Sequence, residues 1–149
     1  MKKRITKYLG GIALLSVLAL FSCQKEGELN RTERKLVGTW TFEQANLQSG
    51  LFSSDDVMSE YDADKLTLKA DYTAEYYDDE TESTSYGTWT KSTETVDDCV
   101  TTVLTLEMTR SSNNEAHQME LHHVTVTKKK LKGGMETPDG KCDFVLVRQ

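Results

Sequence analysis

The sequence predicts an all-β protein, folded as an eight-stranded antiparallel up-and-down β-barrel. Three observations predict this fold. From residue 35 onward, apolar and polar residues alternate with a period of two, and Thr, Val, Tyr and Trp are frequent, as is typical of strands. Turn residues separate these runs at short intervals, which favours hairpins. Almost no 3.6-residue period lies between the runs, so helices do not join the strands, and up-and-down order favours a barrel over a sandwich.

The expected strands are short and follow one another through hairpins. They cover residues 37–42, 66–69, 73–77, 85–91, 99–108, 119–126, 131–135 and 142–147. Asp71-Tyr72 forms the tight turn of one hairpin, and Pro138-Asp139-Gly140 has the residue types of another turn. A first helical turn is expected over residues 30–33, and one or two turns over residues 55–58, within the only stretch with room for a helix.

The sixth strand changes its phase. Met119 and Leu121 occupy odd positions, whereas Val124 and Val126 occupy even ones. A strand that keeps one face buried can change phase only by inserting a residue. The sequence therefore predicts a β-bulge at His122-His123.

The last strand carries apolar residues on both faces. Phe144 and Leu146 share one face, and Val145 and Val147 share the other. Strands of this kind are usually buried on both sides. We therefore expect this strand to be covered on both faces.

The N-terminus has the pattern of a bacterial lipoprotein signal. Four basic residues lie within the first seven positions, an apolar run of about 14 residues follows, and Leu20-Phe21-Ser22-Cys23 resembles a lipobox. Cleavage before Cys23 would leave its thiol to carry a diacylglycerol. An uncleaved anchor and a buried helix are the alternatives, but the run is shorter than the roughly 20 residues of a spanning helix and has no polar face. The chain then divides into a signal peptide (1–22), a lipidated tether (23–34) and a barrel domain (35–149).

The residues after Cys23 bear on localisation. The second mature residue is Gln24, not the Asp of inner-membrane retention signals, and residues 24–28 resemble short acidic export tags of surface lipoproteins. We expect a lipid anchor in the outer membrane. The sequence does not decide between its periplasmic and its external face. Without residues 1–22 the chain has 14 basic and 24 acidic residues, a formal charge of −10. Such a surface repels phosphate backbones, so nucleic acid is not an expected partner. The oligomeric state is not predicted.

A Gly-Thr-Trp motif occurs twice, at Gly38-Thr39-Trp40 and at Gly87-Thr88-Trp89. A glycine two places before a tryptophan lets the chain bend at a strand entrance, and the indole then plugs the closed end of a small barrel. We expect both tryptophans to be buried and both glycines to start strands.

The first of these motifs resembles the opening motif of the lipocalins, a short helical lead-in followed by Gly-x-Trp on the first strand. Residues 66–71, 87–90, 104–106 and 144–148 are similar to segments of lipocalin-like domains in bacterial lipoproteins, and the resemblance spans residues 35–148. It implies an eight-stranded barrel with an internal cup for a small apolar molecule. It also implies that Arg148 packs over Trp40. Asp71-Tyr72 stands where relatives carry Asp-Gly, so this turn is expected to be looser.

Cys99 and Cys142 are the two cysteines of the expected barrel. In an oxidising compartment they form a possible disulfide, with two unpaired, half-buried thiols as the alternative. Both lie at the starts of expected strands that are not neighbours in an eight-stranded barrel. A bridge would therefore have to cross one end of the barrel.

The sequence lacks the patterns of an enzyme. No nucleophile elbow, Cys-x-x-Cys pair, His-Glu-x-x-His or phosphate-binding glycine loop is present, so we expect neither catalysis nor a cofactor. No metal is expected, because His122 and His123 would share an ion only if the bulge turned one of them round. The acidic residues 78–82 lack the spacing of a calcium loop and are interpreted as a solvated hairpin tip.

Two functions from different classes remain open. The first is a carrier of a small hydrophobic ligand inside the barrel, with one open mouth rimmed by residues 48–64 and 111–116. The second is an envelope accessory or adhesion protein whose barrel is filled. The expected lining is apolar and comprises Trp40, Phe42, Leu68, Tyr76, Trp89, Leu104, Leu106, Met119 and Leu121. The free volume inside the barrel distinguishes the two.

Overall fold

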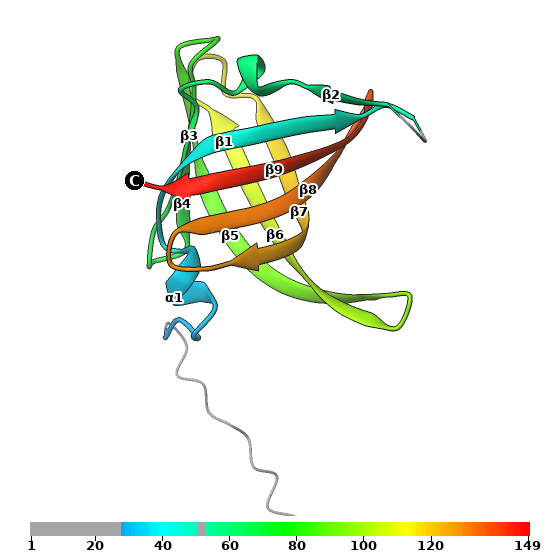
Figure 1. Cartoon of the computed structure of the whole chain (residues 1–149). Helices are drawn as coiled ribbons and strands as arrows, with labels where there is room; N and C mark the ends of the chain where they lie inside the picture. Colours follow the sequence, from blue (N-terminus) through cyan, green and yellow to red (C-terminus); the bar gives the residue numbers. More distant parts are fainter. Residues whose placement is uncertain (1–27, 51–52) are drawn as a thin grey trace, which may run out of the picture.

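The computed structural model describes residues 28–50 and 53–149, so the expected signal peptide and Cys23 lie outside the described residues. The described chain is almost entirely strand (Figure 1). Its elements in chain order are α1 (Glu33–Leu36), β1 (Gly38–Gln48), β2 (Ser54–Asp56), the 3-10 helix η1 (Met58–Glu60), β3 (Lys65–Leu68), β4 (Thr73–Asp78), β5 (Ser83–Val96), β6 (Cys99–Arg110), β7 (Ala116–Val126), β8 (Lys130–Thr137) and β9 (Gly140–Arg148).

The strands form one closed antiparallel barrel. From β3 to β9 each strand pairs with the next, β1 pairs with β3, and β1 also pairs with β9 to close the sheet. The closing register runs from Trp40 opposite Arg148 to Gln48 opposite Lys141. The short strand β2 pairs only with the end of β1, so it is not one of the eight strands that close the barrel. The predicted eight-stranded up-and-down barrel is confirmed.

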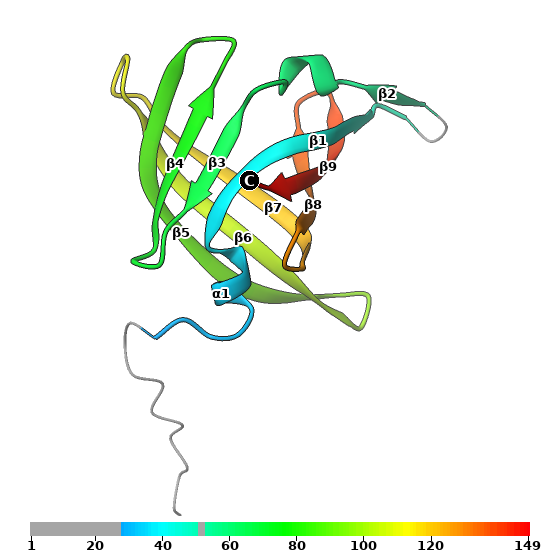
Figure 2. The ribbon, with the colours of Figure 1, turned by 60° about the vertical axis from the view of Figure 1, so that its left-hand side comes forward.

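One end of the barrel is closed by α1, as Figure 2 shows from a second direction. The helix begins where the Asn30 side-chain oxygen accepts the backbone N–H groups of Thr32 and Glu33, while Glu33 accepts the backbone N–H of Asn30. This reciprocal arrangement resembles a capping box. The helix begins three residues later than expected, at Glu33.

Trp40 and Trp89 are fully buried in the core, as predicted. The indole N–H of Trp40 donates to the Leu36 carbonyl over 2.8 Å, and that of Trp89 donates to the Lys69 carbonyl over 2.9 Å. Each tryptophan therefore satisfies its one polar group at the closed end, where Leu36 of α1 is also fully buried.

The predicted bulge at His122-His123 is confirmed. His122 pairs with Gly134 and Thr125 pairs with Lys132, so one extra residue lies in β7, and His123 has a positive φ of 53°. A second bulge, not anticipated, lies in β1 between Phe42 and Gln44. Both bulges bend long strands around the barrel.

Three local expectations are wrong. Residues 55 and 56 belong to β2, and only Met58–Glu60 forms a helical turn, because Asp56 accepts the N–H of Met58 through its side chain. Gly87 lies inside β5 and does not start a strand. The outer face of β9 is not fully covered, since Val145 and Val147 are only half-buried.

β5 and β6 extend past their other neighbours as a two-stranded arm. Pairing of β4 with β5 stops at Thr88, and pairing of β6 with β7 stops at Leu104, whereas β5 and β6 remain paired as far as Val96 and Cys99. In both views the tip of this arm reaches the level of α1 (Figures 1 and 2).

Candidate functional site: the mouth of the barrel

The end of the barrel opposite α1 is the candidate site. The η1 segment and the β6–β7 turn both lie at this end, as expected for the two rim segments (Figures 1 and 2). Tyr61 follows η1 and its ring lies between two phenylalanines of the barrel wall. The centroid of the Tyr61 ring is 5.1 Å from that of Phe42 and 5.0 Å from that of Phe144, and the two phenylalanine rings are 5.4 Å apart.

Backbone hydrogen bonds fix Tyr61 above the mouth. The N–H of Val57 donates to the carbonyl of Ala45 over 3.0 Å, which ties the segment to β1. The N–H of Tyr61 then donates to Met58, and that of Asp64 donates to Tyr61. Ala63 has a positive φ of 71°, which turns the chain down into β3. Burial raises the pKa of Tyr61 to about 12, so its hydroxyl is neutral at physiological pH.

The interior beneath Tyr61 is almost full. The free volume of this apolar pocket is about 10 Å³. That is space for about one water molecule, whereas ligand pockets usually measure roughly 300–1,000 Å³. The lining is entirely apolar or aromatic and comprises Phe42, Tyr61, Leu66, Tyr76, Met119, Leu121, Met135, Phe144 and Leu146.

A buried carboxyl group borders the mouth. Asp64 is 3% exposed; one of its side-chain oxygens accepts the hydroxyl of Tyr76 and the other accepts the backbone N–H of Asp79 over 2.8 Å. Burial raises the pKa of Asp64, and the two hydrogen bonds oppose this effect only in part. The pKa of Tyr76 is raised by burial and by its bond to Asp64. The pair connects the start of β3 with the β4–β5 hairpin.

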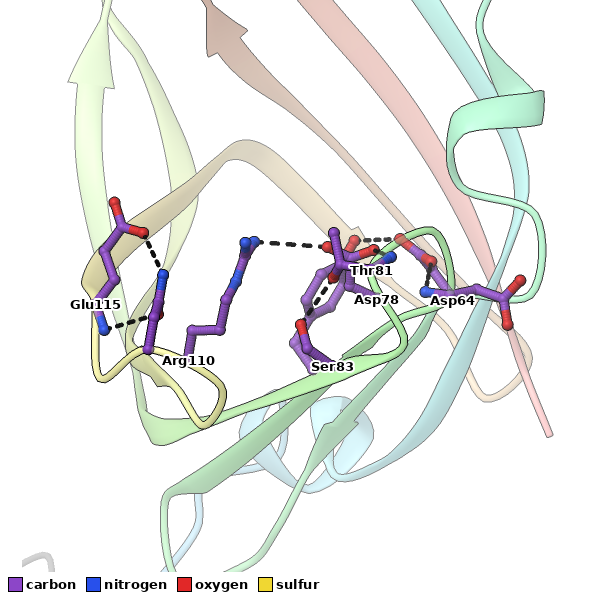
Figure 3. A network of polar contacts seen from close by, with 9 residues as sticks. Asp64, Asp78, Thr81, Ser83, Arg110 and Glu115 are labelled. Atoms are coloured by element: carbon purple, nitrogen blue, oxygen red, sulfur yellow. Dashed lines mark hydrogen bonds and ion pairs between the residues drawn. The ribbon is translucent and has the colours of Figure 1, made fainter.

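The same network continues to the β6–β7 hairpin (Figure 3). Arg110 of β6 points toward Asp78 of β4, with 3.5 Å between the guanidinium nitrogen and the carboxylate oxygen. The N–H of Ser111 donates to the Thr84 carbonyl over 3.0 Å. These polar contacts link the start of β3, the β4–β5 hairpin and the β6–β7 hairpin, which together form the rim of the mouth.

The predicted lining residues divide between the two ends of the barrel. Phe42, Tyr76, Met119 and Leu121 line the pocket at the mouth. The other five are fully buried elsewhere in the core: Trp40, Leu68, Trp89, Leu104 and Leu106. The prediction missed Tyr61, Leu66, Met135, Phe144 and Leu146 as lining residues. The inward phase of the last strand signalled Phe144 and Leu146, whereas no pattern in residues 48–64 signalled Tyr61.

The possible disulfide between Cys99 and Cys142 is absent, and both thiols are free. Cys99 is exposed near the tip of the arm, beside the turn at Asp97-Asp98. Cys142 is 1% exposed in β9, opposite Leu47 and Met135. The arm therefore carries one thiol away from the wall that holds the other. Both thiols are unpaired, as the alternative had it, but neither is half-buried: Cys99 is exposed and Cys142 is buried.

The histidines at the β7 bulge do not converge. Nδ1 of His122 lies 3.0 Å from the Glu94 carboxylate, and this hydrogen bond lowers the pKa of Glu94. Nε2 of His122 is 3.7 Å from Glu120. His123 is exposed. Within residues 28–50 and 53–149, no group of three or more His, Cys, Asp or Glu side chains is arranged to hold a metal ion.

The fold and the mouth define a closed eight-stranded up-and-down antiparallel barrel with a plugged apolar interior. Comparisons with protein-family models, with curated proteins and with solved structures give no match. In the part of the chain that the structure describes, no helix has the length and apolarity needed to cross a membrane.

Proposed function

We propose that this chain is a lipocalin-like accessory lipoprotein of the cell envelope, anchored in the outer membrane through lipid on Cys23. Its barrel is a filled scaffold that meets partners through its outer surface. The observation that carries this proposal is the free volume of about 10 Å³ at the mouth. A carrier needs a pocket more than ten times larger.

The packing of both ends supports a filled barrel. Trp40 and Trp89 occupy the closed half, where both indoles are fully buried. Phe42, Tyr61 and Phe144 occupy the mouth, with ring centroids 5.0–5.4 Å apart. Aromatic pairs at such distances add favourable contacts to the burial of apolar surface. A ligand would have to replace these contacts before it gained its own.

A second candidate is a carrier of a small apolar molecule that displaces Tyr61. The observation that favours it is the position of Tyr61 itself, half-buried on a short segment between a 3-10 turn and β3. Met119 and Met135 also line the pocket, and methionine side chains adapt readily to new shapes. Movement of one side chain would open the apolar interior to solvent.

Thermal unfolding with a panel of fatty acids, retinoids, haem and quinones separates the two candidates. A ligand that binds the folded state raises the melting temperature as its concentration increases. We expect no shift for the wild-type protein and no change in Trp40 or Trp89 fluorescence. A concentration-dependent shift would overturn the filled scaffold and support the carrier.

Two variants sharpen this experiment. Tyr61→Ala enlarges the mouth, and Tyr86→Ala removes a tyrosine that is 53% exposed on β5 and serves as the matched control. Binding by Tyr61→Ala alone would show that the pocket exists only when the plug is removed, as a filled scaffold requires. Binding by wild type and by Tyr86→Ala would show that Tyr61 moves aside unaided.

A further inference from the structure

Two basic segments meet at the closed end of the barrel. Arg31, in the turn before α1, and Arg34, in α1, are exposed, and so are Lys128 and Lys129 in the β7–β8 turn. We call these four residues the basic end. Both segments lie at the same end of the barrel in Figures 1 and 2.

Arg148 holds the two segments together. Its guanidinium donates to the carbonyl of Lys35 in α1 and, over 2.9 Å, to the carbonyl of Lys128 in the turn. Its backbone N–H donates to the carbonyl of Lys129 over 2.9 Å. The two segments that carry the four positive side chains are therefore held together by the hydrogen bonds of a fifth basic residue to their backbone carbonyls.

The charge of this surface is opposite to that of the molecule. The chain after residue 22 has a formal charge of −10, yet the basic end concentrates four exposed cations. Glu33 is turned inward, where it accepts the Asn30 N–H and the Tyr72 hydroxyl. The exposed acids of the neighbouring segments are Glu28, Asp71 and Glu43, and Glu43 forms an ion pair with Lys130, which is not counted in the basic end. Four exposed cations therefore face two other exposed acids, and the local balance remains positive.

The described chain begins at this same end. Glu28 is the first described residue and is five residues from Cys23. Five residues reach at most about 18 Å when fully extended. A lipid on Cys23 would therefore keep the start of the described chain within about two screening lengths of the membrane surface, since the screening length is about 8–10 Å in physiological salt.

We propose that the basic end binds the anionic headgroups of the membrane that holds the Cys23 lipid, and so orients the barrel with its mouth and Tyr61 away from the bilayer. This inference rests on the proposed lipid anchor. Lysine and arginine side chains near an anionic bilayer are attracted to it individually, and the effect falls within a screening length. The arm tip carries the exposed residues Asp97 and Asp98 and reaches the same level to one side of α1, so these two acids oppose part of the attraction.

Amine labelling of the mature lipidated protein in vesicles tests the orientation. The protein is reconstituted in phosphatidylcholine alone or in phosphatidylcholine mixed with phosphatidylglycerol, and each lysine is quantified by mass spectrometry. Labelling of Lys128 and Lys129 should fall about threefold or more in the anionic vesicles, and high salt should abolish this protection. Labelling of Lys65, which is exposed at the mouth end of β3, should not change.

A charge-reversal pair provides the matched control. Lys35, which is half-buried in α1 beside Arg34, is the reporter in these variants, and its labelling in the wild-type protein should also fall in anionic vesicles. In Lys128→Glu/Lys129→Glu this protection of Lys35 should disappear, whereas in Lys65→Glu/Lys132→Glu, with the same change in net charge, it should persist. Equal labelling in both vesicle types, or protection of Lys65 in place of Lys128, overturns the orientation. Failure of the anchor gives a different result, because the purified chain would then lack an acyl mass on Cys23 and would not float with vesicles.

Discussion

The guanidinium carbon of Arg148 lies 4.3 Å from the centre of the Trp40 ring, which confirms the pairing implied by the lipocalin resemblance. The same guanidinium donates to the carbonyls of Lys35, Val37 and Lys128. Gly38 makes this approach possible, because a Cβ at that position would lie 2.2 Å from Nη1 of Arg148. Arg148, near the C-terminus, thus contacts the helix, the β7–β8 turn and the tryptophan of the first strand at once, and connects them.

Arg148→Ala should lower the free energy of unfolding by about 2–4 kcal/mol, since it removes a cation–π contact and leaves charged hydrogen bonds unmade. Arg148→Lys should cost less but still destabilise, because an ammonium group cannot make three divergent bonds from a planar fork. Urea unfolding followed by tryptophan fluorescence measures both. Equal stability of wild type and Arg148→Ala would show that the contact contributes nothing net.

Gly87→Ala tests the close approach of β6 to β5. A Cβ at Gly87 would lie 1.8 Å from the carbonyl oxygen of Glu107, so β5 and β6 would have to separate beside Trp89. We expect a loss of about 1–3 kcal/mol, as for other overpacked positions. Gly50→Ala is the control, because its Cβ would meet only the Ser53 hydroxyl at 3.1 Å. A Gly87→Ala protein as stable as Gly50→Ala would contradict the close approach.

The structure of the closed end could be predicted from the sequence because short sequence patterns determine it. The tryptophan of the Gly-x-Trp motif predicts the plug, and the indoles of Trp40 and Trp89 are buried as predicted, although only Gly38 starts a strand. The phase change across His122-His123 predicted a bulge for the same kind of reason. Phe42 and Ala45 show a similar phase change in β1, so that bulge too could have been found.

The structure of the mouth could not be predicted from the sequence in this way. Tyr61 lies in an irregular segment, where no periodicity says which side chain faces the core. Its position depends on the bond from Val57 to Ala45 and on the positive φ of Ala63, which are tertiary and local backbone features without a sequence signature. The lining was therefore predicted too far toward the closed end, at residues such as Leu68 and Leu104.

The two barrel cysteines should differ in reactivity. Cys99 is exposed, whereas Cys142 is buried and burial raises the pKa of its thiol. Because the thiolate is the reactive form, a maleimide should modify Cys99 in the native protein and Cys142 only after unfolding. Mass spectrometry of the unreduced protein should find both thiols free. A mass lower by two hydrogens within one chain would contradict the separation seen in the structure.

Replacement of Cys23 tests the proposed anchor. Cys23→Ala removes the thiol that would accept the diacylglycerol, so we expect an unprocessed precursor that takes up no labelled palmitate. Cys99→Ala removes a thiol that is exposed on the barrel and provides the control, which should be labelled like wild type. Palmitate incorporation that persists in Cys23→Ala would place the lipid elsewhere or remove the anchor from the proposal.

Asp64 should make the stability fall as the pH rises. Its folded-state pKa is raised by burial above the ordinary value of 3.8, so the folded protein holds a proton that the unfolded chain has released. In that window folding takes up a proton, and the free energy of unfolding decreases with pH until the folded carboxyl has also ionised. Asp64→Asn cannot ionise. Its stability relative to wild type should therefore increase from about pH 4 upward and then become constant.

Tyr76→Phe provides the complementary measurement. The Tyr76 hydroxyl donates to Asp64, and this bond lowers the pKa of the carboxyl against the effect of burial. Its removal should raise the folded-state pKa of Asp64 further, so the pH-dependent loss of stability should become larger and extend to higher pH. Urea unfolding of the three proteins across the acidic to neutral range measures these differences. A wild-type curve parallel to that of Asp64→Asn at every pH would show that the Asp64 carboxyl has the same pKa in the folded and unfolded states.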